Sequence, residues 1–384
     1  MLIDLIMISK LGTSDGGREI WLKNFLQEIG GSVPDKNNLF FNLITLNKAE
    51  KNILNKEYDF LIKNHIQYKP IFKKIPISIK FIIFCLIKFF FKKKEAEHVL
   101  AVGGLEEALA TVMGYSFRRV RGKRILWLRT IYTKEKGYLL NRFTQKFLLM
   151  FEIFIIKNFF DLIVANGDDT ADFYRAYGVE CHVIKNSIDL KKWSNPDSNF
   201  SENKLDIAFI GRLAEVKGIK SFLDAIIVLK ESMPTENIKF HVIGDGPFSV
   251  EVEKLANKNL LTYYGAIPNQ DLPKIMKKFD CCVGLTYLSE FMGGGGVSNA
   301  LIEQMASGKI MVCWANNIFY NVLNQDSCYF VNQGNIEELA DTFLEISNNK
   351  EISAKKVLNS YLISQNYSIE IHVKIFFSLL EMKK

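Results

Sequence analysis

The second half of the chain alternates short, unbroken apolar runs with longer stretches in which apolar residues recur at helical spacing. The runs include LDIAFIG (205–211) and KIMVCWA (309–315), and the helical stretches include IKSFLDAIIVLKES (219–232) and NIEELADTFLEISNN (335–349). Unbroken apolar runs are typical of parallel strands that are covered on both faces of their sheet. This alternation predicts an α/β domain with a parallel, Rossmann-like sheet.

The first half shows the same alternation more loosely. Its first ten residues, MLIDLIMISK, carry Asp4 within the apolar run and no small-residue cleavage site. We therefore expect a buried first strand and not a signal peptide. Further strands are expected at HVLAVGG (98–104) and RILWLRT (124–130), and the polar stretch 193–204, which contains a proline, is typical of a linker.

The length and composition agree with two globular domains. A chain of 384 residues is long enough for two cores, which we place at 1–192 and 203–365. Apolar residues make up 48% and charged residues 24%, a balance that argues against broad disorder. The six cysteines show neither CxxC pairing nor zinc-ligand spacing, so we expect reduced core residues of a cytoplasmic protein.

Basic residues are concentrated in the first half. Residues 1–190 hold 29 of the 49 Lys and Arg residues but only 20 of the 42 Asp and Glu residues, a net charge of +9. This excess predicts an anionic partner. Because no recognition motif accompanies the charge, nucleic acid is not the partner that we expect.

Residues 61–94 contain nine lysines, no acidic residue and a long apolar run. The run is short for a transmembrane helix, which needs ~20 apolar residues, so we expect an interfacial helix on an anionic membrane. A buried helix with lysine ends is the alternative. The membrane-facing lysines would be Lys73, Lys74, Lys92, Lys93 and Lys94, and a second basic cluster would add Arg118, Arg119, Arg121, Lys123 and Arg124.

The segment FIGRLAEVKG (209–218) carries the first candidate chemistry. A strand ends at Gly211, Arg212 follows it, and Lys217 comes just before the next helix. In open parallel sheets, ligands bind beyond the carboxyl ends of the strands. Two cations there would bind a diphosphate and stabilise it as a leaving group. A solvated arginine and a solvated lysine at a turn are the alternative.

Two further segments would complete a nucleotide site. HVIGDGP (241–247) places Gly244 and Gly246 after a strand, where the main chain can approach a ligand closely, although a plain turn is the alternative. In SEFMGGGGVSNALIEQMASGK (289–309), Ser298 is a candidate N-cap for a helix that opens with Asn299 and Ala300. Its N-terminus would bind phosphate. Glu303 would accept hydrogen bonds from vicinal hydroxyls, or would be a solvated helix residue.

Together these segments resemble the nucleotide-sugar-binding domain of retaining GT4 glycosyltransferases, which have the GT-B fold. The resemblance implies two Rossmann-like domains that face each other across a cleft. It implies that Arg212 and Lys217 hold the donor diphosphate and act in catalysis, and that Glu303 holds the ribose. The first domain is similar in SDGGREIWLKNFLQEI, where Gly16, Gly17 and Glu19 match the family's glycine loop. A C-terminal helix over 366–384 is expected to cross back to the first domain.

Two features depart from the family's usual pattern. The family has two glutamates separated by seven residues, but Gly295 stands eight residues before Glu303. We expect Glu290 to replace the missing catalytic glutamate. The sugar-contacting loop would then consist of Gly293, Gly294, Gly295 and Gly296. The family also has a histidine after a strand of the first domain, and the candidate segment WLRTIYT contains none.

The resemblance thus implies a retaining glycosyltransferase that needs no cofactor. The chain has no Asp-x-Asp pair, which predicts a metal-independent mechanism. A UDP- or GDP-sugar is the expected donor. The expected acceptor is a lipid-linked or oligosaccharide precursor of lipopolysaccharide, capsule or a similar glycan. The expected location is cytoplasmic, at the inner face of the membrane. The alternatives are a nucleotide-sugar epimerase or sugar phosphorylase on the same fold, and a non-catalytic membrane-associated partner.

Overall fold

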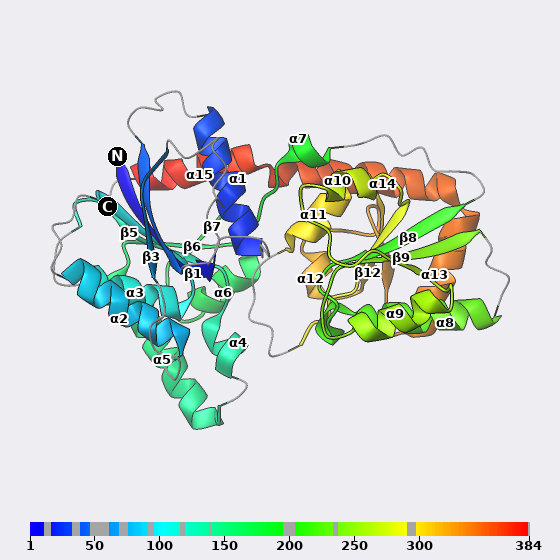
Figure 1. Cartoon of the computed structure of the whole chain (residues 1–384), viewed down its shortest axis with the longest axis horizontal. Coiled ribbons are helices and arrows are strands. Elements are labelled where there is room, and N and C mark those ends of the chain that lie inside the picture. Colours follow the sequence, from blue (N-terminus) through cyan, green and yellow to red (C-terminus); the bar gives the residue numbers. More distant parts are fainter. Residues whose placement is uncertain are drawn as a thin grey trace. The chain divides into compact units, whose positions relative to one another are not determined.

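The computed structural model divides the chain into two compact units (Figure 1). The first contains Met1–Ser187 and Ile369–Lys384, and the second contains Ile188–Ser289 and Val297–Ser368. The structure describes residues 1–10, 17–32, 39–46, 61–68, 76–90, 96–115, 120–137, 140–194, 204–232, 237–289 and 297–382.

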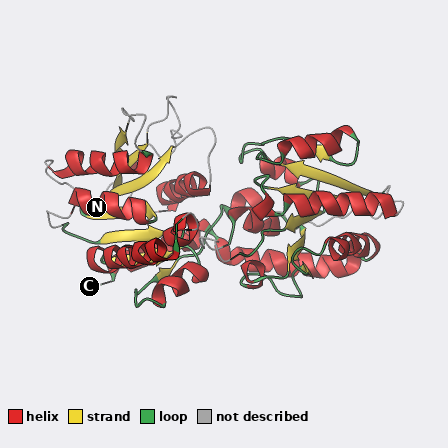
Figure 2. Ribbon diagram, turned by 90° about the horizontal axis from the view of Figure 1, so that it is seen from below, coloured by secondary structure: helices red, strands yellow, loops and turns green. Residues whose placement is uncertain are grey.

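The first unit is built on a parallel sheet, which has seven strands among the described residues. Figure 2 shows the strands between layers of helices. Every pairing in the sheet is parallel. In spatial order the strands are β3 (Ile62–Tyr68), β2 (Phe40–Leu46), β1 (Leu2–Lys10), β4 (His98–Gly103), β5 (Arg124–Leu128), β6 (Leu162–Ala165) and β7 (His182–Val183).

Helices cover both faces of this sheet. Alternate strand residues point to opposite faces, so each face has its own core. One core joins the sheet to α1 (Gly17–Ser32) and α15 (Ile369–Glu381). The helices on the other face are α2 (Ile77–Phe90), α3 (Leu105–Tyr115), α5 (Arg142–Phe159) and α6 (Asp168–Arg175), with the short α4 (Tyr132–Gly137) nearby.

The second unit repeats the architecture with a parallel sheet of six described strands. Their order is β10 (Thr262–Tyr263), β9 (Ile238–Ile243), β8 (Leu205–Ile210), β11 (Cys281–Gly284), β12 (Ile310–Trp314) and β13 (Tyr329–Val331). The helices are α7 (Leu190–Trp193), α8 (Ile219–Ser232), α9 (Ser249–Asn257), α10 (Leu272–Met276), α11 (Asn299–Ala306), α12 (Asn317–Tyr320), α13 (Ile336–Asn348) and α14 (Lys350–Ser364). Two 3₁₀ turns lie at Glu215–Lys217 and Gln365–Tyr367.

The predicted fold class, two parallel-sheet Rossmann-like domains, is confirmed. The first strand is buried as expected, from Ile3 to Ile8, and all six cysteines are free and buried. The pattern gave no prediction for strands β2 and β3 or for helix α5. Within the described ranges, no helix combines the length and apolar character that crossing a membrane requires.

One part of the predicted membrane face is wrong. The ammonium of Lys123 is buried and donates to the carbonyl oxygens of Leu379 (2.7 Å) and Met382 (2.6 Å), at the end of α15. Arg124 pairs with Asp161 at 3.3 Å. These two cations therefore hold the unit together and are not free to meet headgroups. Arg118 and Arg119 lie outside the described residues, as do Lys73, Lys74, Lys92, Lys93 and Lys94.

Candidate functional site

The second unit contains a pocket at the carboxyl ends of β8 and β11, with a volume of about 160 Å³. This is the edge at which parallel α/β sheets bind ligands. The pocket brings together five of the predicted site residues, from two separate segments of the chain. They are Gly211, Arg212, Lys217, Ser298 and Ala300.

Arg212 and Lys217 are neighbouring cations in this pocket. Arg212 directly follows Gly211 after β8, and Lys217 ends the 3₁₀ turn that precedes α8. Burial and the nearby charge of Arg212 lower the pKa of Lys217. Within the described part of the chain, neither residue forms an ion pair. Two unpaired cations held side by side repel each other, so a bound anion would relieve that repulsion.

The predicted glycines Gly244 and Gly246 do not line the pocket, but they contact the main chain on either side of Arg212. A Cβ atom on Gly244 would lie 1.8 Å from the carbonyl oxygen of Gly211, and one on Gly246 would lie 2.5 Å from that of Leu213. Side chains therefore cannot be placed at either position without moving the main chain. The effect is to bring the ends of β8 and β9 into direct contact behind Arg212.

The N-terminus of α11 faces the same pocket. The Ser298 side chain caps the helix by accepting a hydrogen bond from the Leu301 amide at 3.2 Å. The first amides of a helix, here those of Asn299 and Ala300, have no partner within the helix and carry the positive end of its dipole. Together with Arg212 and Lys217 they give the pocket a positive lining, which suits a phosphate group.

Glu303 lies one turn further along α11 and is buried rather than solvated. Its carboxylate accepts a hydrogen bond from Asn269 Nδ2 at 3.2 Å. Asn269 in turn accepts from the ammonium of Lys192 at 2.6 Å. Burial raises the pKa of Glu303 to about 7, and Asn269 and Lys192 limit the rise. Glu303 is thus poised to change its charge near neutral pH.

Other predicted residues are placed elsewhere or lie outside the described residues. Gly17 begins α1 in the first unit and is exposed, with open space where a Cβ would stand. Gly16, Glu290, Gly293, Gly294, Gly295 and Gly296 lie outside the described residues.

The pocket also contains residues that sequence reasoning missed, namely Thr286, Gln304 and Phe319. Gln304 adjoins Glu303 on the helix, which could have drawn attention to it. Phe319 comes from α12, a four-residue helix with no periodic signal. Asn269 and Lys192, the partners of Glu303, are likewise polar residues without a recognisable motif.

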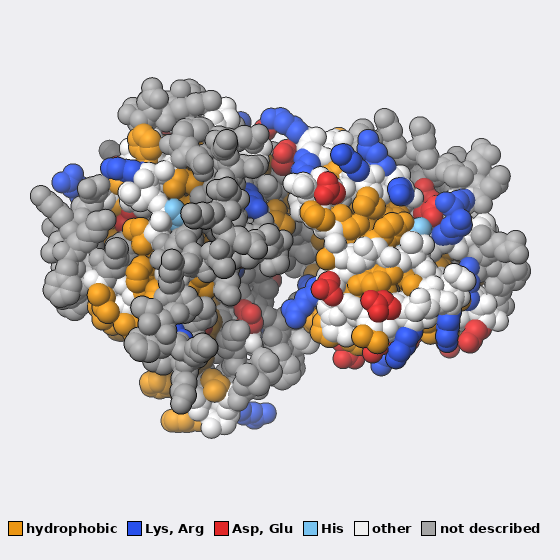
Figure 3. All heavy atoms as spheres, viewed as in Figure 1, with side chains coloured by type: hydrophobic (Ala, Val, Ile, Leu, Met, Phe, Trp, Pro, Cys, Tyr) orange, Lys and Arg blue, Asp and Glu red, His pale blue; other side chains and the backbone are white. Residues whose placement is uncertain are grey.

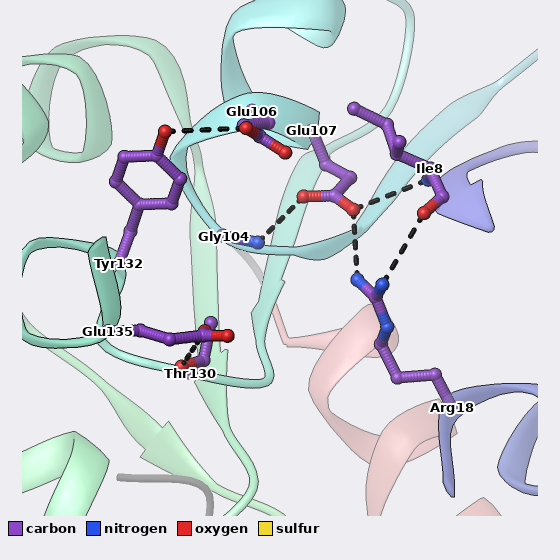
Figure 4. A network of polar contacts seen from close by, with 8 residues as sticks. All are labelled: Ile8, Arg18, Gly104, Glu106, Glu107, Thr130, Tyr132 and Glu135. Carbon is purple, nitrogen blue, oxygen red and sulfur yellow. Dashed lines mark hydrogen bonds and ion pairs between the residues drawn. The ribbon is translucent and has the colours of Figure 1, made fainter. Parts of the chain in front are cut away.

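The first unit holds a second polar cluster at the carboxyl edge of its own sheet (Figure 4). The buried carboxylate of Glu107 accepts hydrogen bonds from the amides of Gly104 (2.9 Å) and Ile8 (3.3 Å) and pairs with Arg18 (3.1 Å). Burial raises the pKa of Glu107, and Arg18 opposes that rise. The cluster joins the ends of β1 and β4 to the first turns of α1 and α3.

Arg129 lies at the same edge, directly after β5. Its guanidinium carbon is 5.1 Å from the centre of the Trp21 ring. Its Nε and Nη1 atoms are buried without a hydrogen-bond partner among the described residues. Burial and the charge of Arg18 lower the pKa of Arg129 to about 9. Buried guanidinium nitrogens without a hydrogen-bond partner among the described residues are costly, which marks Arg129 as a candidate ligand-binding residue. Arg129 belongs to the WLRTIYT segment, which lacks the family's histidine.

Comparisons with known proteins agree with this description of the second unit. Residues 204–349 match the model of the family described as glycosyl transferases group 1. A curated relative, the uncharacterized glycosyltransferase MJ1069 of Methanocaldococcus jannaschii, is 27% identical over 237 residues, which are 60% of this chain and 53% of that protein. The chain thus matches about half the length of this relative. The resemblance to glycosyltransferases that the motifs predicted is confirmed.

Solved structures share the fold over nearly the whole chain. Anabaena HepE in complex with UDP and glucose has a TM-score of 0.70 at 16% identity, with 99% of each chain covered. Sucrose-phosphate synthase of Thermosynechococcus elongatus has a TM-score of 0.72 at 16% identity, with 98% of each covered. WaaB, a lipopolysaccharide outer core galactosyltransferase, has a TM-score of 0.64 at 14% identity, with 98% of each covered. At these identities the likeness shows the fold.

Proposed function

We propose that the protein is a glycosyltransferase that moves a sugar from a nucleotide-sugar donor to a lipid-linked or oligosaccharide acceptor in the synthesis of a surface glycan. The observation that carries this proposal is the positive pocket of the second unit. There Arg212 and Lys217, which form no ion pair with the described residues, lie beside the N-terminus of α11. Such a lining fits the diphosphate of a nucleotide sugar.

The same residues suggest how the reaction proceeds. As the bond between sugar and phosphate breaks, negative charge grows on the diphosphate, and Arg212 and Lys217 would stabilise it. Two fixed cations can do this without a metal ion, so we propose a metal-independent reaction. Retention of the anomeric configuration is proposed from the GT4 resemblance, as is the contact between Glu290 and the donor sugar.

The donor is proposed to be a UDP-sugar, with a GDP-sugar as the other candidate. HepE was solved with UDP and glucose, which supports a uridine nucleotide on this fold. Glu303 is proposed to hold the ribose hydroxyls, since an ionised carboxylate accepts two hydrogen bonds well. WaaB, by its name a galactosyltransferase of lipopolysaccharide, supports an acceptor that belongs to a surface glycan. Such an acceptor would place the protein at the cytoplasmic face of the membrane.

The proposal is tested by thermal shift with UDP-, GDP-, CMP- and dTDP-sugars, followed by transfer assays with lipid-linked acceptors. Arg212→Ala and Lys217→Ala should each weaken binding of the nucleotide diphosphate about tenfold or more, because each removes a charge-assisted contact. Lys254→Ala, an exposed lysine of α9 outside the pocket, is the matched control. Unchanged affinity in both pocket variants would remove the basis of the proposal.

The same assays separate the alternative functions. An epimerase would convert the donor and release no free nucleoside diphosphate when an acceptor is present. A phosphorylase would require inorganic phosphate. A non-catalytic partner would bind the nucleotide yet transfer no sugar from any donor. We expect release of the nucleotide diphosphate that depends on the acceptor.

A further inference from the structure

Helix α5 of the first unit exposes a stripe of large apolar side chains. Phe143 is 84% exposed, Phe147 68%, Met150 65% and Phe154 55%. Their spacing of four, three and four residues places them on one face of the helix. The opposite face, which includes Glu152, Ile155 and Ile156, is buried against the unit. Figure 3 shows apolar and basic side chains together at the tip of the unit where Figure 1 draws α5.

This exposure is unusual for a folded unit. Scattered apolar residues on a surface need no explanation, but a continuous stripe of phenylalanine and methionine marks an interaction surface. The rest of α5 is well fixed, since Asn141 caps its first turn by accepting from the Thr144 amide at 2.9 Å. The stripe is therefore presented by an ordered helix, in a unit whose cores are formed without it.

The charges on α5 indicate what covers the stripe. Its basic residues, Arg142, Lys146 and Lys157, are all exposed. Its single acidic residue, Glu152, is buried and accepts hydrogen bonds from Thr133 and from Tyr174. The exposed surface of α5 is thus apolar with positive flanks and carries no acid. A second copy of this surface would bring like charges together, whereas an anionic lipid surface would satisfy both features.

Helix α2 of the same unit also exposes an apolar face. Ile79 is 48% exposed, Ile83 45% and Ile87 63%, again at helical spacing on one face. Helix α3 contacts both α2 and α5, so the three helices form one layer on the same side of the sheet. Helix α2 carries no acidic residue either. Two helices of one layer therefore expose apolar faces without negative charge.

We propose that the first unit docks on an anionic lipid bilayer through α5, assisted by α2. The stripe of Phe143, Phe147, Met150 and Phe154 would enter the boundary between headgroups and acyl chains, and Arg142 and Lys146 would contact the lipid phosphates. This refines the membrane location given under the proposed function. It does not depend on sugar transfer, because lipid binding is measured without donor or acceptor.

The test is flotation of the full-length protein with lipid vesicles. Wild-type protein should float with vesicles containing phosphatidylglycerol and much less with phosphatidylcholine alone. A variant with Phe143→Ser, Phe147→Ser and Met150→Ser should bind at least about tenfold more weakly, because it loses most of the inserted apolar surface. The control carries Ile352→Ser, Leu358→Ser and Leu362→Ser on α14 of the second unit, three residues that are each 55% exposed.

A second measurement follows insertion directly. Phe147→Trp places an exposed indole on the stripe, whereas the four native tryptophans are buried. Brominated lipids should quench the new tryptophan and leave wild-type fluorescence nearly unchanged. Arg142→Gln with Lys146→Gln should reduce binding to the anionic vesicles and weaken its dependence on salt.

Three results would overturn the proposal. One is that wild-type protein does not float with anionic vesicles. Another is that the α14 control loses as much vesicle binding as the α5 variant. The third is a wild-type protein that self-associates in sedimentation while the α5 variant sediments as a monomer. That result would mean that the stripe binds a second copy of the chain. None of these results bears on nucleotide binding by the second unit, so the proposed function is judged separately.

Discussion

Trp21 of α1 donates a 2.8 Å hydrogen bond from Nε1 to Nε2 of His372, on α15. The other ring nitrogen, Nδ1, donates to the carbonyl oxygen of Lys185 at 2.9 Å. These two bonds fix His372 as a neutral imidazole that carries its proton on Nδ1. The ring also stacks on Trp127, with centroids 4.9 Å apart. One histidine thus connects the first helix, the segment after β7 and the last described helix.

This arrangement predicts that the first unit loses stability in mild acid. Burial lowers the pKa of His372 from 6.5 to about 3. Below pH 6.5 the unfolded chain takes up a proton that the folded chain does not, so the free energy of unfolding falls as the pH falls toward 3. The slope approaches about 1.4 kcal/mol per pH unit. Urea unfolding between about pH 7.5 and pH 5 measures it.

The matched variant for this test is His372→Gln, which can still accept from Trp21 and donate to Lys185. Unfolding of this variant should take up about one proton fewer, so its free energy of unfolding should change less with pH over the same range. An unchanged pH dependence would show that His372 is not the group responsible.

A second prediction concerns Glu303 and rests on its proposed contact with the ribose. Because the pKa of Glu303 is about 7, the carboxyl is largely neutral below that pH and accepts hydrogen bonds less well. Affinity for UDP should therefore rise between about pH 6 and pH 8. Glu303→Gln should lower the affinity roughly 10- to 100-fold, as expected for a lost bond to a charged group, and remove the pH dependence. Calorimetry measures both.

Glu251→Gln, at an exposed position of α9, is the control for the neutralised charge. It should leave the affinity and its pH dependence unchanged. If wild-type binding is independent of pH across neutrality, Glu303 does not hold the nucleotide.

The close contact between Gly244 and Gly211 predicts that Gly244→Ala disturbs the pocket. The φ of Gly244 is 141°, and its added Cβ would overlap the Gly211 carbonyl oxygen. The backbone conformation alone should cost about 1–3 kcal/mol of stability, and relief of the overlap would move Arg212. Both the melting temperature and the affinity for UDP should fall.

Gly265→Ala separates these two causes. Gly265 also has a positive φ, 68°, but no atom lies within 4 Å of the position that an added Cβ would take. This variant should lose stability and keep its affinity for UDP. Equal affinities in the two variants would show that the Gly244 contact does not shape the pocket.

The environment of Arg129 predicts that replacing it lowers activity without lowering the stability of the fold. Since its Nε and Nη1 atoms are buried without a hydrogen-bond partner among the described residues, Arg129→Met should change the free energy of unfolding by less than about 1 kcal/mol or raise it. If the positive charge of Arg129 binds an anionic ligand, the same variant should have at least about tenfold lower transfer activity. Arg121→Met, at an exposed position, is the control. A large loss of stability in Arg129→Met would instead assign the residue a structural role.

Much of the fold and part of the site follow from local sequence. Unbroken apolar runs predicted parallel strands because a strand covered on both faces has no polar side. Gly211, Arg212 and Lys217 could be placed at the end of a strand because the turn is encoded within ten residues. Ser298 could be assigned as an N-cap for the same reason, since its partner, Leu301, is three residues away.

Only the tertiary structure determines which polar side chains are buried and which groups they bond to. The sequence presents Glu303 as a helix residue, and only the folded unit brings Asn269 and Lys192 to it, across 34 residues and then 77. Lys123 was interpreted as a surface cation, yet its partners lie 256 and 259 residues away, on α15 and just after it. Side chains so distant in sequence leave no local pattern.

The amino-acid sequence by itself therefore determined the α/β architecture, the glycosyltransferase resemblance and several of the polar residues that line the pocket. Periodicity and turn chemistry act over a few residues, so they can be read directly from the chain. Only the tertiary structure decided which charges are buried, as for Arg129 and Glu303, and which apolar residues are exposed, as for Phe143 on α5. Exposure depends on what the rest of the fold covers, and that is a property of the whole unit.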